Sequence, residues 1–374
     1  MKVVFIQPGQ FLRTSRKTNP FFDPIIDVCQ KNGIEWELYL PSVQVEMGYP
    51  KDHIRDYHWF SSFSKWFWRV THVLFPWLSV ARVHWLHGLF ARPFCRAWRE
   101  AELVITIAQM YLDELAAIRP KKLVADVQHG VIYSSHSGCF SRDHLLRQAL
   151  QRYGYREFWL YGPGYANCFF KNPENHRWLD GRVKIVGDVA RHEVVTASED
   201  SRKLIVVSGQ FKPESDRVCM LDQVKGLRTF LRCFYAKYGS RYQLMIRHHP
   251  RFCGIAELDA LHREFPQFTE TKESWSALYG RMYLHVTFSS TVVFDAASNG
   301  IPSYFLMPSD PQDPVLENAF WRDDYACPFY GKPLDEMMED AGLAMVREDT
   351  RKWYEQFYAP FDETNCLQLL KGGL

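Results

Sequence analysis

Two short stretches in the C-terminal half combine residue types that suit a phosphate group. The first, residues 247–251 (RHHPR), places four cationic or potentially cationic side chains within five residues, which is poor material for a buried core. Arginine can bind a phosphate through two hydrogen bonds, and histidine can donate one. Arg247, His249 and Pro250 are therefore candidates for holding a phosphate or diphosphate.

The second stretch is Ser289-Ser290-Thr291, which joins a strand-like run (Tyr283–Phe288) to a helix-like run (Thr291–Asn299). Hydroxyl groups and unpaired backbone N–H groups at the start of a helix form a ready anion site. A serine that only caps the helix, with no ligand, is the alternative interpretation.

A histidine that follows another strand-like run is a candidate general base. His129 precedes Gly130, which permits a tight turn, and Asp126 lies three residues before it. Histidine titrates near neutral pH, and a neighbouring carboxylate can orient or polarise it. If the strand continues that far, Asp126 and His129 point to opposite faces, so that only one acts as the base. The alternatives are a carboxylate base at Asp126 and a purely structural histidine.

Two glycine-containing turns would let the backbone approach a ligand, although each can equally be a plain loop. They are Ser208-Gly209-Gln210 and residues 161–165 (YGPGY). Neither matches a dinucleotide fingerprint or a P-loop, which argues against dehydrogenases and P-loop NTPases. With no zinc spacing and no Asp-x-Asp pair, the sequence predicts neither a metal site nor a cofactor.

Short apolar strands alternate with helices along the chain, which predicts parallel sheets covered on both faces. The polar residues 196–203 interrupt this alternation, so we expect two Rossmann-like domains, 1–195 and 203–374. The carboxyl ends of parallel strands share one edge, and we expect the turns at 249 and 289 to lie side by side there. The expected strands are Val3–Gln7, Trp36–Leu40, Leu103–Ala108, Leu123–Val127, Glu157–Tyr161, Val183–Val186, Leu204–Ser208, Gln243–Arg247, Tyr283–Phe288 and Ser303–Leu306. The expected helices are Asn19–Asn32, Asp113–Ile118, Asp222–Tyr238, Ile255–Glu264, Thr291–Asn299 and Thr350–Phe357.

Composition narrows the class of partner. The 374 residues carry a net charge of +2, which is too balanced for a nucleic-acid binder by charge alone. Nine cysteines without CxxC pairs indicate reduced thiols in a cytosolic protein. The N-terminal residues lack the features of a signal peptide, and no run of about 18 apolar residues is present. The sequence therefore predicts a cytoplasmic protein.

One segment departs from the alternation. Residues 57–99 contain six of the twelve tryptophans and six Lys or Arg, without Asp or Glu. Aromatic rings with basic groups suit the headgroup zone of an anionic membrane. The alternative is that the tryptophans pack against the first domain while the arginines line its surface. Pro76 and Pro93 interrupt any helical pattern there.

Four motifs resemble those of GT-B glycosyltransferases of bacterial surface-polysaccharide synthesis. They are HGVIY (129–133), VGDVARHE (186–193), HHPR (248–251) and TFSSTVVFDAASNGIP (287–302). The most similar groups are bacterial sialyltransferases, Kdo transferases and CDP-glycerol glycerophosphotransferases. The resemblance implies two Rossmann-like domains whose sheets face an interdomain cleft.

The resemblance also assigns roles to residues. His249 with Pro250 and Ser289 with Ser290 match the His-Pro and Ser-Ser motifs that bind the phosphate and ribose side of a cytidine nucleotide. His129-Gly130 matches a His-Gly motif of the glycerophosphotransferases, in which the histidine is the base. The acidic pair before glycine of the sialyltransferases is absent, and Asp126 is only a loose substitute for it.

These observations predict a metal-independent GT-B glycosyltransferase. Its donor would be a CMP-sugar such as CMP-Kdo or CMP-sialic acid, and its acceptor a glycan or lipid-linked glycan. The alternatives are transfer of a polyol phosphate from CDP-glycerol, and a UDP-sugar transferase or epimerase of the same two-domain architecture. Residues 57–99 would contact the inner face of an anionic membrane, and no nucleic-acid partner is expected.

Overall fold

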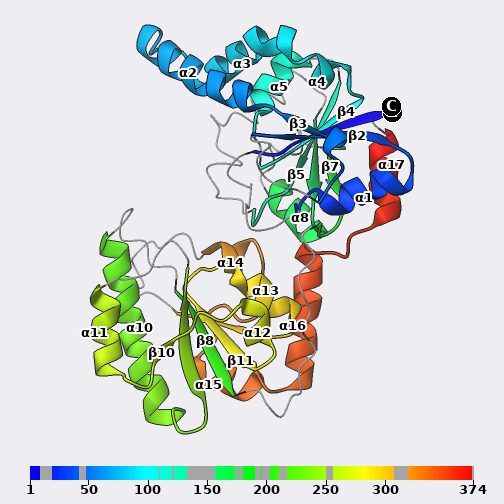
Figure 1. Cartoon of the computed structure of the whole chain (residues 1–374). Helices are drawn as coiled ribbons and strands as arrows, with labels where there is room; N and C mark the ends of the chain where they lie inside the picture. The colour runs from blue at the N-terminus through cyan, green and yellow to red at the C-terminus, as the bar shows by residue number, and fades with distance from the viewer. Residues whose placement is uncertain are drawn as a thin grey trace. The chain divides into compact units, whose positions relative to one another are not determined.

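The computed structural model describes residues 1–8, 19–41, 48–108, 110–119, 122–132, 156–171, 173, 176, 180–189, 195, 203–209, 217–249, 256–306 and 319–372. The chain divides into two compact units (Figure 1). The first contains Met1–Arg191 and Phe357–Leu374, and the second contains His192–Gln356. The sequence predicts that residues 357–374 belong to the second domain, but these residues pack in the first unit. Gln210 and Pro250, and most of the expected linker at 196–203, lie outside the described residues.

Within the described residues, the first unit is built on a seven-stranded parallel sheet in the order β3-β2-β1-β4-β5-β6-β7. Val3–Ile6 and most of the neighbouring strand β4 are fully buried, as expected for a parallel sheet covered on both faces. The strand order reverses between β1 and β4, which makes this the switch point of the sheet. Its strands are β1 (Lys2–Ile6), β2 (Glu35–Leu40), β3 (Ile54–Asp56), β4 (Leu103–Ile107), β5 (Leu123–Val127), β6 (Arg156–Leu160) and β7 (Val183–Ile185).

The helices of the first unit include a long pair within residues 57–99, the segment that departs from the alternation of strands and helices. Pro76 lies in the turn between α2 and α3, and Pro93 lies in the short helix η3, so neither proline interrupts a long helix. The helices are α1 (Asp23–Lys31), η2 (Lys51–His53), α2 (His58–Leu74), α3 (Val80–Ala91), η3 (Arg92–Phe94), α4 (Arg96–Glu100), α5 (Leu112–Ile118), α8 (Pro163–Phe170) and α17 (Glu363–Gly372).

The C-terminal segment is fastened to the first unit by backbone hydrogen bonds. The N–H of Asp188 donates to the carbonyl of Ala359 (2.7 Å), and the N–H of Ala359 donates to that of Tyr161 (3.0 Å). Gly187 has a φ of +89°, and a Cβ there would collide with the backbone of Pro360. The described part of the VGDVARHE motif therefore has a structural role, because only glycine allows the C-terminal segment to cross so closely.

Within the described residues, the second unit contains a five-stranded parallel sheet in the order β10-β9-β8-β11-β12. The alternation of strands and helices predicted for this half is confirmed, with ends that differ by a few residues. The strands are β8 (Leu204–Gly209), β9 (Gln243–His248), β10 (Thr269–Glu270), β11 (Met282–Thr287) and β12 (Ser303–Phe305). The helices are α10 (Arg217–Lys237), α11 (Ala256–Glu264), α12 (Trp275–Tyr279), α13 (Val292–Ser298), α14 (Ala319–Asp323), α15 (Leu334–Asp340) and α16 (Ala344–Phe357).

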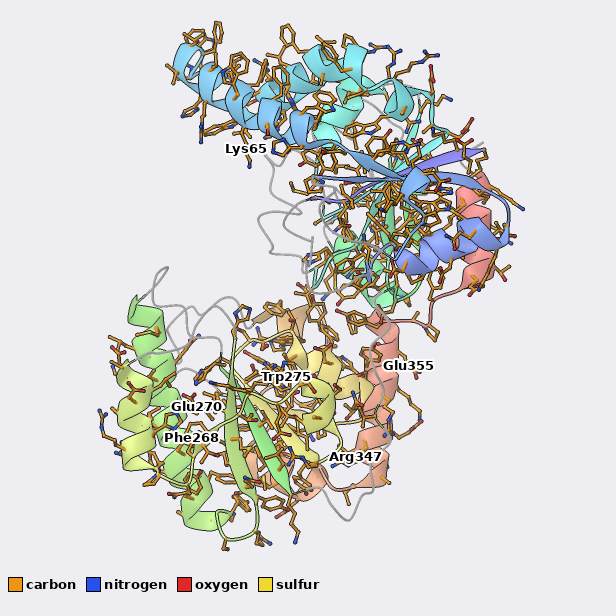
Figure 2. The ribbon with its side chains drawn as sticks, viewed as in Figure 1. Lys65, Phe268, Glu270, Trp275, Arg347 and Glu355 are labelled. Atoms are coloured by element: carbon orange, nitrogen blue, oxygen red, sulfur yellow. The ribbon has the colours of Figure 1, made fainter. Side chains whose placement is uncertain are left out.

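Buried side chains hold α16 in the second unit. The guanidinium of Arg347 (Figure 2) donates to the carbonyls of Gly300 (3.2 Å) and Tyr283 (3.3 Å). The ring of Trp353 stacks on that of Phe294 in α13, with centroids 5.2 Å apart. A buried arginine whose donors meet backbone carbonyls loses little by leaving water, so Arg347 can be part of the core.

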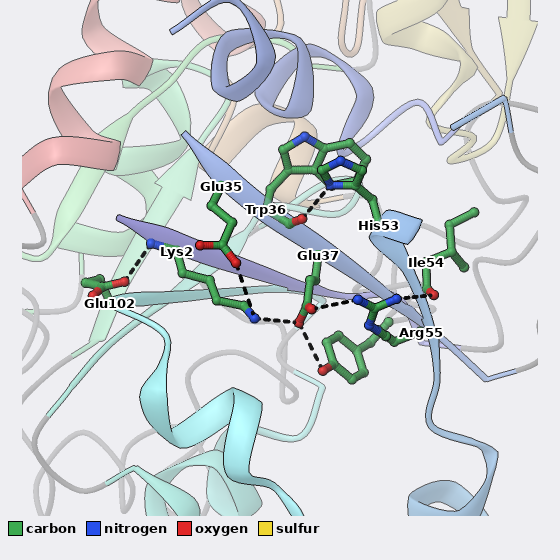
Figure 3. A network of polar contacts seen from close by, with 9 residues as sticks. Lys2, Glu35, Trp36, Glu37, His53, Ile54, Arg55 and Glu102 are labelled. Carbon is green, nitrogen blue, oxygen red and sulfur yellow. Dashed lines mark hydrogen bonds and ion pairs between the residues drawn. The ribbon is translucent and has the colours of Figure 1, made fainter. Parts of the chain in front are cut away.

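A network of ion pairs joins strands β1, β2 and β3 of the first sheet (Figure 3). The carboxylate of Glu37 in β2 forms ion pairs with Lys2 of β1 (3.1 Å) and Arg55 of β3 (3.2 Å). The ring of His53 stacks on Trp36 with centroids 4.3 Å apart. Opposite charges on neighbouring strands favour this register, and they leave the edge strand β3 charged rather than apolar.

None of the helices in the described part of the chain is long and apolar enough to cross a bilayer. The cysteines described there are free thiols, namely Cys29, Cys95, Cys168, Cys233, Cys327 and Cys366.

Candidate functional site

The carboxyl edge of the second sheet brings three of the predicted motifs together. Ser208 of β8 pairs in register with Arg247 of β9 on one side and with Thr287 of β11 on the other. The N–H of His249 donates to the carbonyl of Gly209 (2.8 Å). The strand order reverses between β8 and β11, and ligands of open α/β sheets bind at such a switch point. The candidate site in this unit is therefore the edge where β9, β8 and β11 end.

The order of the strands corrects one expectation. The sequence placed the turns at His249 and Ser289 side by side, but β8 lies between the strands that they follow. Neighbouring strands are about 4.8 Å apart, so the two turns lie roughly two strand spacings from each other. This spacing puts Gly209, the last residue of β8, in the middle of the edge.

The two serines of the Ser-Ser turn, Ser289 and Ser290, differ in their burial and in their hydrogen bonds. The buried Ser290 accepts a hydrogen bond from the N–H of Val292 (3.3 Å) at the start of α13, and its own N–H donates to Oγ1 of Thr287 (2.9 Å). The N-cap of α13 is Thr291, whose side chain makes no capping hydrogen bond, so Ser290 holds the turn before the helix and is not the capping serine of the alternative interpretation. Ser289 is half-buried, and its hydroxyl makes no hydrogen bond within the described residues, while Thr291 is exposed. Ser289 and Thr291 can therefore donate to a ligand.

The hydroxyl of Ser208 is hydrogen-bonded inside the unit to His285, a histidine that the sequence did not single out. His285 is fully buried, with Nε2 3.0 Å from Oγ of Ser208 and Nδ1 2.9 Å from Oγ of Ser303. Burial lowers the pKa of His285 to about 3, so the ring is neutral. A buried row of hydroxyl, imidazole and hydroxyl thus links β8, β11 and β12. Gly209 is the member of this turn that can approach a ligand.

Arg247 and His249 differ in how they are held. Nε of Arg247 donates to the carbonyl of Glu273 (2.7 Å), and its guanidinium lies 5.1 Å from the ring centre of Trp275. The two Nη groups make no hydrogen bond within the described residues, so they can meet an anion. His249 is half-buried at the end of β9. His248, between them, is held instead by Glu270 (3.1 Å).

The first unit presents Asp126 and His129 at the carboxyl end of β5. β5 ends at Val127, so Asp126 is a buried strand residue whereas His129 lies in the exposed turn beyond it, against the ring of Phe21 (5.3 Å). The expected alternation of faces therefore does not extend to His129. The position of this turn is set by Gln128, which sequence reasoning missed.

Gln128 is bonded on both sides of its amide. Its Nε2 donates to the carbonyl of Gly130 (2.7 Å), and its Oε1 accepts from the N–H of Tyr161 (2.9 Å). The hydroxyl of Tyr161 in turn donates to the Gln128 carbonyl (2.6 Å). With Gly130 at a φ of +68°, these bonds hold the backbone on both sides of His129 in one conformation.

Two further features of the first sheet's carboxyl edge carry no obvious signal in the sequence. Burial raises the pKa of Asp23, which opens α1, to about 6 even though its carboxylate accepts from the N–H of Asn19. Ala108 and Tyr111, which follow β4, have φ values of +56° and +60°. Left-handed backbone at residues other than glycine is strained and is often found at functional sites. Both features adjoin the β1–β4 switch point.

The fold matches known structures across almost its whole length. Over 99% of this chain and 95% of the other, it superposes on the MnaA–UDP complex of S. aureus with a TM-score of 0.55 and 12% identity. Over 100% of this chain and 99% of the other, it superposes on UDP-GlcNAc 2-epimerase from Neisseria meningitidis bound to UDP-GlcNAc, with a TM-score of 0.54 and 13% identity. The glycosyltransferase SnogD from Streptomyces nogalater gives 0.50 and 14% over the same shares. The chain adopts the GT-B fold.

The GT-B fold is what these similarities establish, because identities of this size carry no information about substrate. A search with protein-family models finds no match to the sequence, and neither does a search among curated proteins. The predicted α/β class with two Rossmann-like units is confirmed.

The tryptophan-rich segment of this GT-B chain is partly core and partly surface. One face of α2 packs inward through Phe60, Phe67 and Thr71, and Trp98 of α4 is buried beside Phe60 (ring centres 5.0 Å apart). α3 approaches α5 so closely that a Cβ on Gly88 would collide with the backbone of Glu114. The alternative prediction, packing against the first domain, is correct for this face.

The outer face of the α2–α3 pair (residues 58–91) is apolar and basic. Trp66 is 58% exposed, and Trp77 in the turn between the helices is 74% exposed. Lys65 projects from α2 (Figure 2), and Arg69 and Arg82 are exposed with it. The outward face of a surface helix is normally polar, so an apolar patch there marks an interaction site. Further exposed apolar residues of the pair and the segment after it are Trp59, Trp68, Val73, Leu74, Phe75, Val80, Leu89, Phe90 and Phe94.

A buried ion pair anchors α3 to the rest of the unit. Nδ1 of His84 lies 2.6 Å from Oε1 of Glu114 in α5, and Nδ1 of His87 lies 3.6 Å from the same oxygen. Burial, the largest single influence, raises the pKa of Glu114, but the interactions with His84 and His87 and the backbone together outweigh it, and the net effect lowers the pKa to about 2. Glu114 is therefore ionised, and His84, whose pKa it raises, balances its charge.

Proposed function

We propose that this GT-B chain is a glycosyltransferase that moves a sugar from a nucleotide-activated donor to a hydroxyl of a glycan or lipid-linked glycan. The observation that carries the proposal is the convergence of Gly209, Arg247, His249, Ser289 and Thr291 on one edge of the second sheet, at its switch point. Backbone N–H groups, hydroxyls, an imidazole and a guanidinium together suit the diphosphate or phosphate of such a donor.

The proposed chemistry needs one base and one set of charge-stabilising groups. A base removes the proton of the acceptor hydroxyl, whose oxygen forms a bond to the anomeric carbon while the bond from that carbon to the phosphate oxygen breaks. His129 is the proposed base, with Asp126 as its competitor. His249, Ser289 and Arg247 are proposed to stabilise the charge that develops on the leaving phosphate. The donor is a substrate, and the proposal includes no cofactor.

The identity of the nucleotide has two lines of support. The His-Pro and Ser-Ser motifs favour a CMP-sugar, and they also fit the polyol-phosphate donor CDP-glycerol. The S. aureus and N. meningitidis structures are of proteins bound to UDP and UDP-GlcNAc, which favours a UDP-sugar. We propose a pyrimidine nucleotide, which all three donors share.

The test is to incubate the purified chain with CMP-sugars, UDP-sugars or CDP-glycerol, with and without an acceptor glycan. The proposal predicts that one pyrimidine nucleotide is released, and that an acceptor increases the release. A chain that binds none of CMP, CDP and UDP in a thermal-shift panel containing GDP would contradict it. A ligand present at 100 times its Kd stabilises a protein by about 2.7 kcal/mol, which such a panel detects.

A second candidate function is epimerisation of a UDP-sugar. It is favoured by the similarity to the UDP-GlcNAc 2-epimerase from N. meningitidis. An epimerase needs no acceptor. Conversion of UDP-GlcNAc without an acceptor, with no transfer to any glycan, would therefore select this function over the first.

We also propose that the α2–α3 pair contacts the inner, cytoplasmic face of an anionic membrane, where a lipid-linked acceptor would reside. Exposed tryptophans suit the interface between headgroups and acyl chains, and Lys65, Arg69 and Arg82 suit anionic lipids. In this arrangement the buried face of the pair holds it to the unit while the outer face binds lipid.

Vesicle sedimentation tests the membrane contact. Replacing Lys65, Trp66, Trp68 and Arg69 together should lower binding to anionic vesicles at least about 30-fold, because each basic residue contributes about 1 kcal/mol near such a surface. Activity on a soluble acceptor should be unchanged. The control replaces Leu343, Met345 and Lys352, which are exposed in the second unit. Equal sedimentation of the quadruple variant and the parent would contradict the proposal.

A further inference from the structure

Three side chains beside the candidate nucleotide site form a group that no motif in the sequence predicts. His248 ends β9, His262 lies in the last turn of α11, and Glu270 belongs to the edge strand β10. One nitrogen or oxygen atom from each residue lies within 4.8 Å of the other two. Glu270 and Phe268 are labelled in Figure 2. The strand pairing and the packing of α11 thus bring residues from three separate elements to one point.

The tautomer of His262 is set by its surroundings. Its Nδ1 lies 2.7 Å from the carbonyl of Phe268, and because a carbonyl only accepts, Nδ1 must donate. Nε2 therefore carries a lone pair in the neutral ring. A histidine that donates its other ring N–H to a backbone carbonyl is the usual arrangement of a metal ligand, since that bond fixes the orientation of the ring.

Two buried nitrogens of the group have no hydrogen-bond partner within the described residues. They are Nε2 of His262, which lies beside Glu270, and Nδ1 of His248, which is the other ring nitrogen from the one that meets Glu270, so that only the first bears on an ion between the three side chains. Buried polar atoms are nearly always paired, so unpaired ones call for an explanation such as an ion or a water molecule. Nε2 of His262 lies 3.4 Å from Oε1 of Glu270 without the geometry of a hydrogen bond, so a proton on that nitrogen would be poorly directed.

The distances are also compatible with a metal ion, although the shorter one is a hydrogen-bond distance as well. Oε1 of Glu270 lies 3.1 Å from Nε2 of His248 and 3.4 Å from Nε2 of His262. In a tetrahedral zinc site with bonds of about 2.0–2.1 Å, neighbouring ligand atoms are separated by about 3.3 Å. A metal ion lies off the line that joins two ligands, whereas a shared proton lies on it.

We propose that His248, His262 and Glu270 bind one divalent transition-metal ion of the zinc class. Two imidazoles and one carboxylate suit Zn²⁺, and also Co²⁺ or Ni²⁺, whereas Mg²⁺ and Ca²⁺ prefer oxygen ligands alone. The Glu270 side chain is 49% exposed, which provides a route for the ion and leaves a position for water. Binding displaces the proton that His248 otherwise shares with Glu270.

The ion would join the edge of the sheet to the candidate nucleotide site. β10 is a two-residue strand, held to β9 through the register Thr269↔Met245 and Glu270↔Ile246. The ion adds a link from β10 and α11 to His248, immediately before His249. Its proposed role is to fix the end of β9, so a thermal stabilisation accompanies binding.

The first unit contains a group of the same composition that does not meet these conditions. Nδ1 of His84 is 2.6 Å from Oε1 of Glu114, so the ring nitrogen that faces the carboxylate is already occupied by a short hydrogen bond. Composition alone therefore does not make the site. The proposed site differs in two ways: Nε2 of His262 carries a lone pair in the neutral ring, and Oε1 of Glu270 lies 3.1 Å and 3.4 Å from the two histidine nitrogens.

The experiment is metal analysis of the full chain after equilibration with Zn²⁺ and removal of free ion. We expect one Zn²⁺ per chain, a rise in melting temperature with Zn²⁺ or Co²⁺, and none with Mg²⁺. Co²⁺ should also give the visible absorption bands of a tetrahedral site. His262→Gln and Glu270→Gln should each weaken Zn²⁺ binding about 100-fold or more, beyond the range seen when only a supporting residue is lost.

The matched control is His53→Gln, which removes a half-buried histidine that also meets a backbone carbonyl through Nδ1 (Trp36, 2.8 Å) but lies near a single carboxylate, Asp52 (4.0 Å). It should leave the bound Zn²⁺ unchanged. The proposal is overturned if the parent retains no Zn²⁺. It is equally overturned if His262→Gln and Glu270→Gln, shown to be folded by circular dichroism, retain as much as the parent. Because no nucleotide is present, neither outcome bears on the proposed transferase activity.

Discussion

The carboxyl edges of the two sheets present their candidate functional groups in different ways. In the second unit the edge collects short motifs from three strands, and each motif contributes one or two groups: Gly209, His249 and Ser289. In the first unit the candidate base is on one turn, and Gln128 fixes that turn through Gly130 and Tyr161. A phosphate needs several donors from several directions, whereas a base needs one well-placed nitrogen.

The comparison also separates groups that can meet a ligand from groups that hold the edge together. Ser208 and Ser290 are hydrogen-bonded inside the protein, to His285 and at the start of α13, while Ser289 is half-buried. At the first edge Gln128 is internal and His129 is exposed. On each edge, a buried residue with an internal role thus adjoins a more accessible candidate, and substitutions should distinguish the two.

The largest effect is expected at the first edge. His129→Ala should lower turnover about 100-fold or more, since a general base contributes 10²–10⁴-fold, and should leave nucleotide affinity unchanged. Steady-state kinetics with a soluble acceptor and calorimetry with the nucleotide measure the two quantities.

Two variants serve as controls for this prediction. Gln128→Ala keeps the imidazole but frees the turn, so it should lower kcat less than His129→Ala and lower the melting temperature more. Near-parental turnover in His129→Ala, together with an inactive Asp126→Asn that still binds nucleotide, would assign the base to Asp126 instead.

At the second edge, the two serines of one turn should behave differently. Ser290→Ala removes the buried hydroxyl that accepts from the N–H of Val292 and should cost about 1 kcal/mol of unfolding free energy. Ser289→Ala should leave stability unchanged and weaken nucleotide binding by about 1 kcal/mol, the usual contribution of a hydrogen bond. Urea unfolding and calorimetry on both variants test this. The distinction is wrong if Ser290→Ala changes affinity alone.

The smallest effect concerns pH. Burial raises the pKa of Asp23 from 3.8 to about 6 in the folded state, so ionisation costs the fold stability as the pH rises from about 4 to 6. Asp23→Asn should therefore raise the unfolding free energy above pH 6 and change it little near pH 4. The gain should be about 1 kcal/mol, below the roughly 3 kcal/mol of the whole shift, because the side chain is only partly buried.

Urea unfolding of Asp23→Asn and the parent at both pH values measures this difference. A gain of equal size at pH 4 and pH 7 would show that the effect does not come from ionisation. The pH dependence of turnover adds a second readout, because a carboxyl that titrates near 6 beside the β1–β4 switch point is itself a possible base.

Much of the fold could be predicted because its signals are local. Parallel strands such as Val3–Ile6 are continuous apolar runs, and glycines such as Gly300 end helices. The motifs at 247–251 and 289–291 could be assigned to strand ends for the same reason. The order of the strands could not, and it is this order that puts β8 between the two turns.

The remaining features depend on contacts between residues far apart in the sequence. Nothing near His285 indicates that it joins Ser208 to Ser303, and nothing near Glu270 indicates two histidines beside it. The C-terminal segment was assigned to the wrong domain because its partners, Asp188 and Tyr161, lie well over a hundred residues earlier. The amphipathic character of α2 was obscured by the aromatic residues on its exposed face.

The central claim is that the carboxyl edge of the second sheet binds the nucleotide of the donor. Calorimetric titration of CMP and UDP into the parent and into His249→Ala tests it most directly. We expect one nucleotide to bind the parent at a single site, and His249→Ala to weaken that binding by about 1.5–3 kcal/mol, the contribution of a hydrogen bond to a charged group. His58→Ala, on the surface of the first unit, should bind like the parent. Unchanged affinity in His249→Ala, with the parent binding normally, would place the phosphate elsewhere and contradict the account.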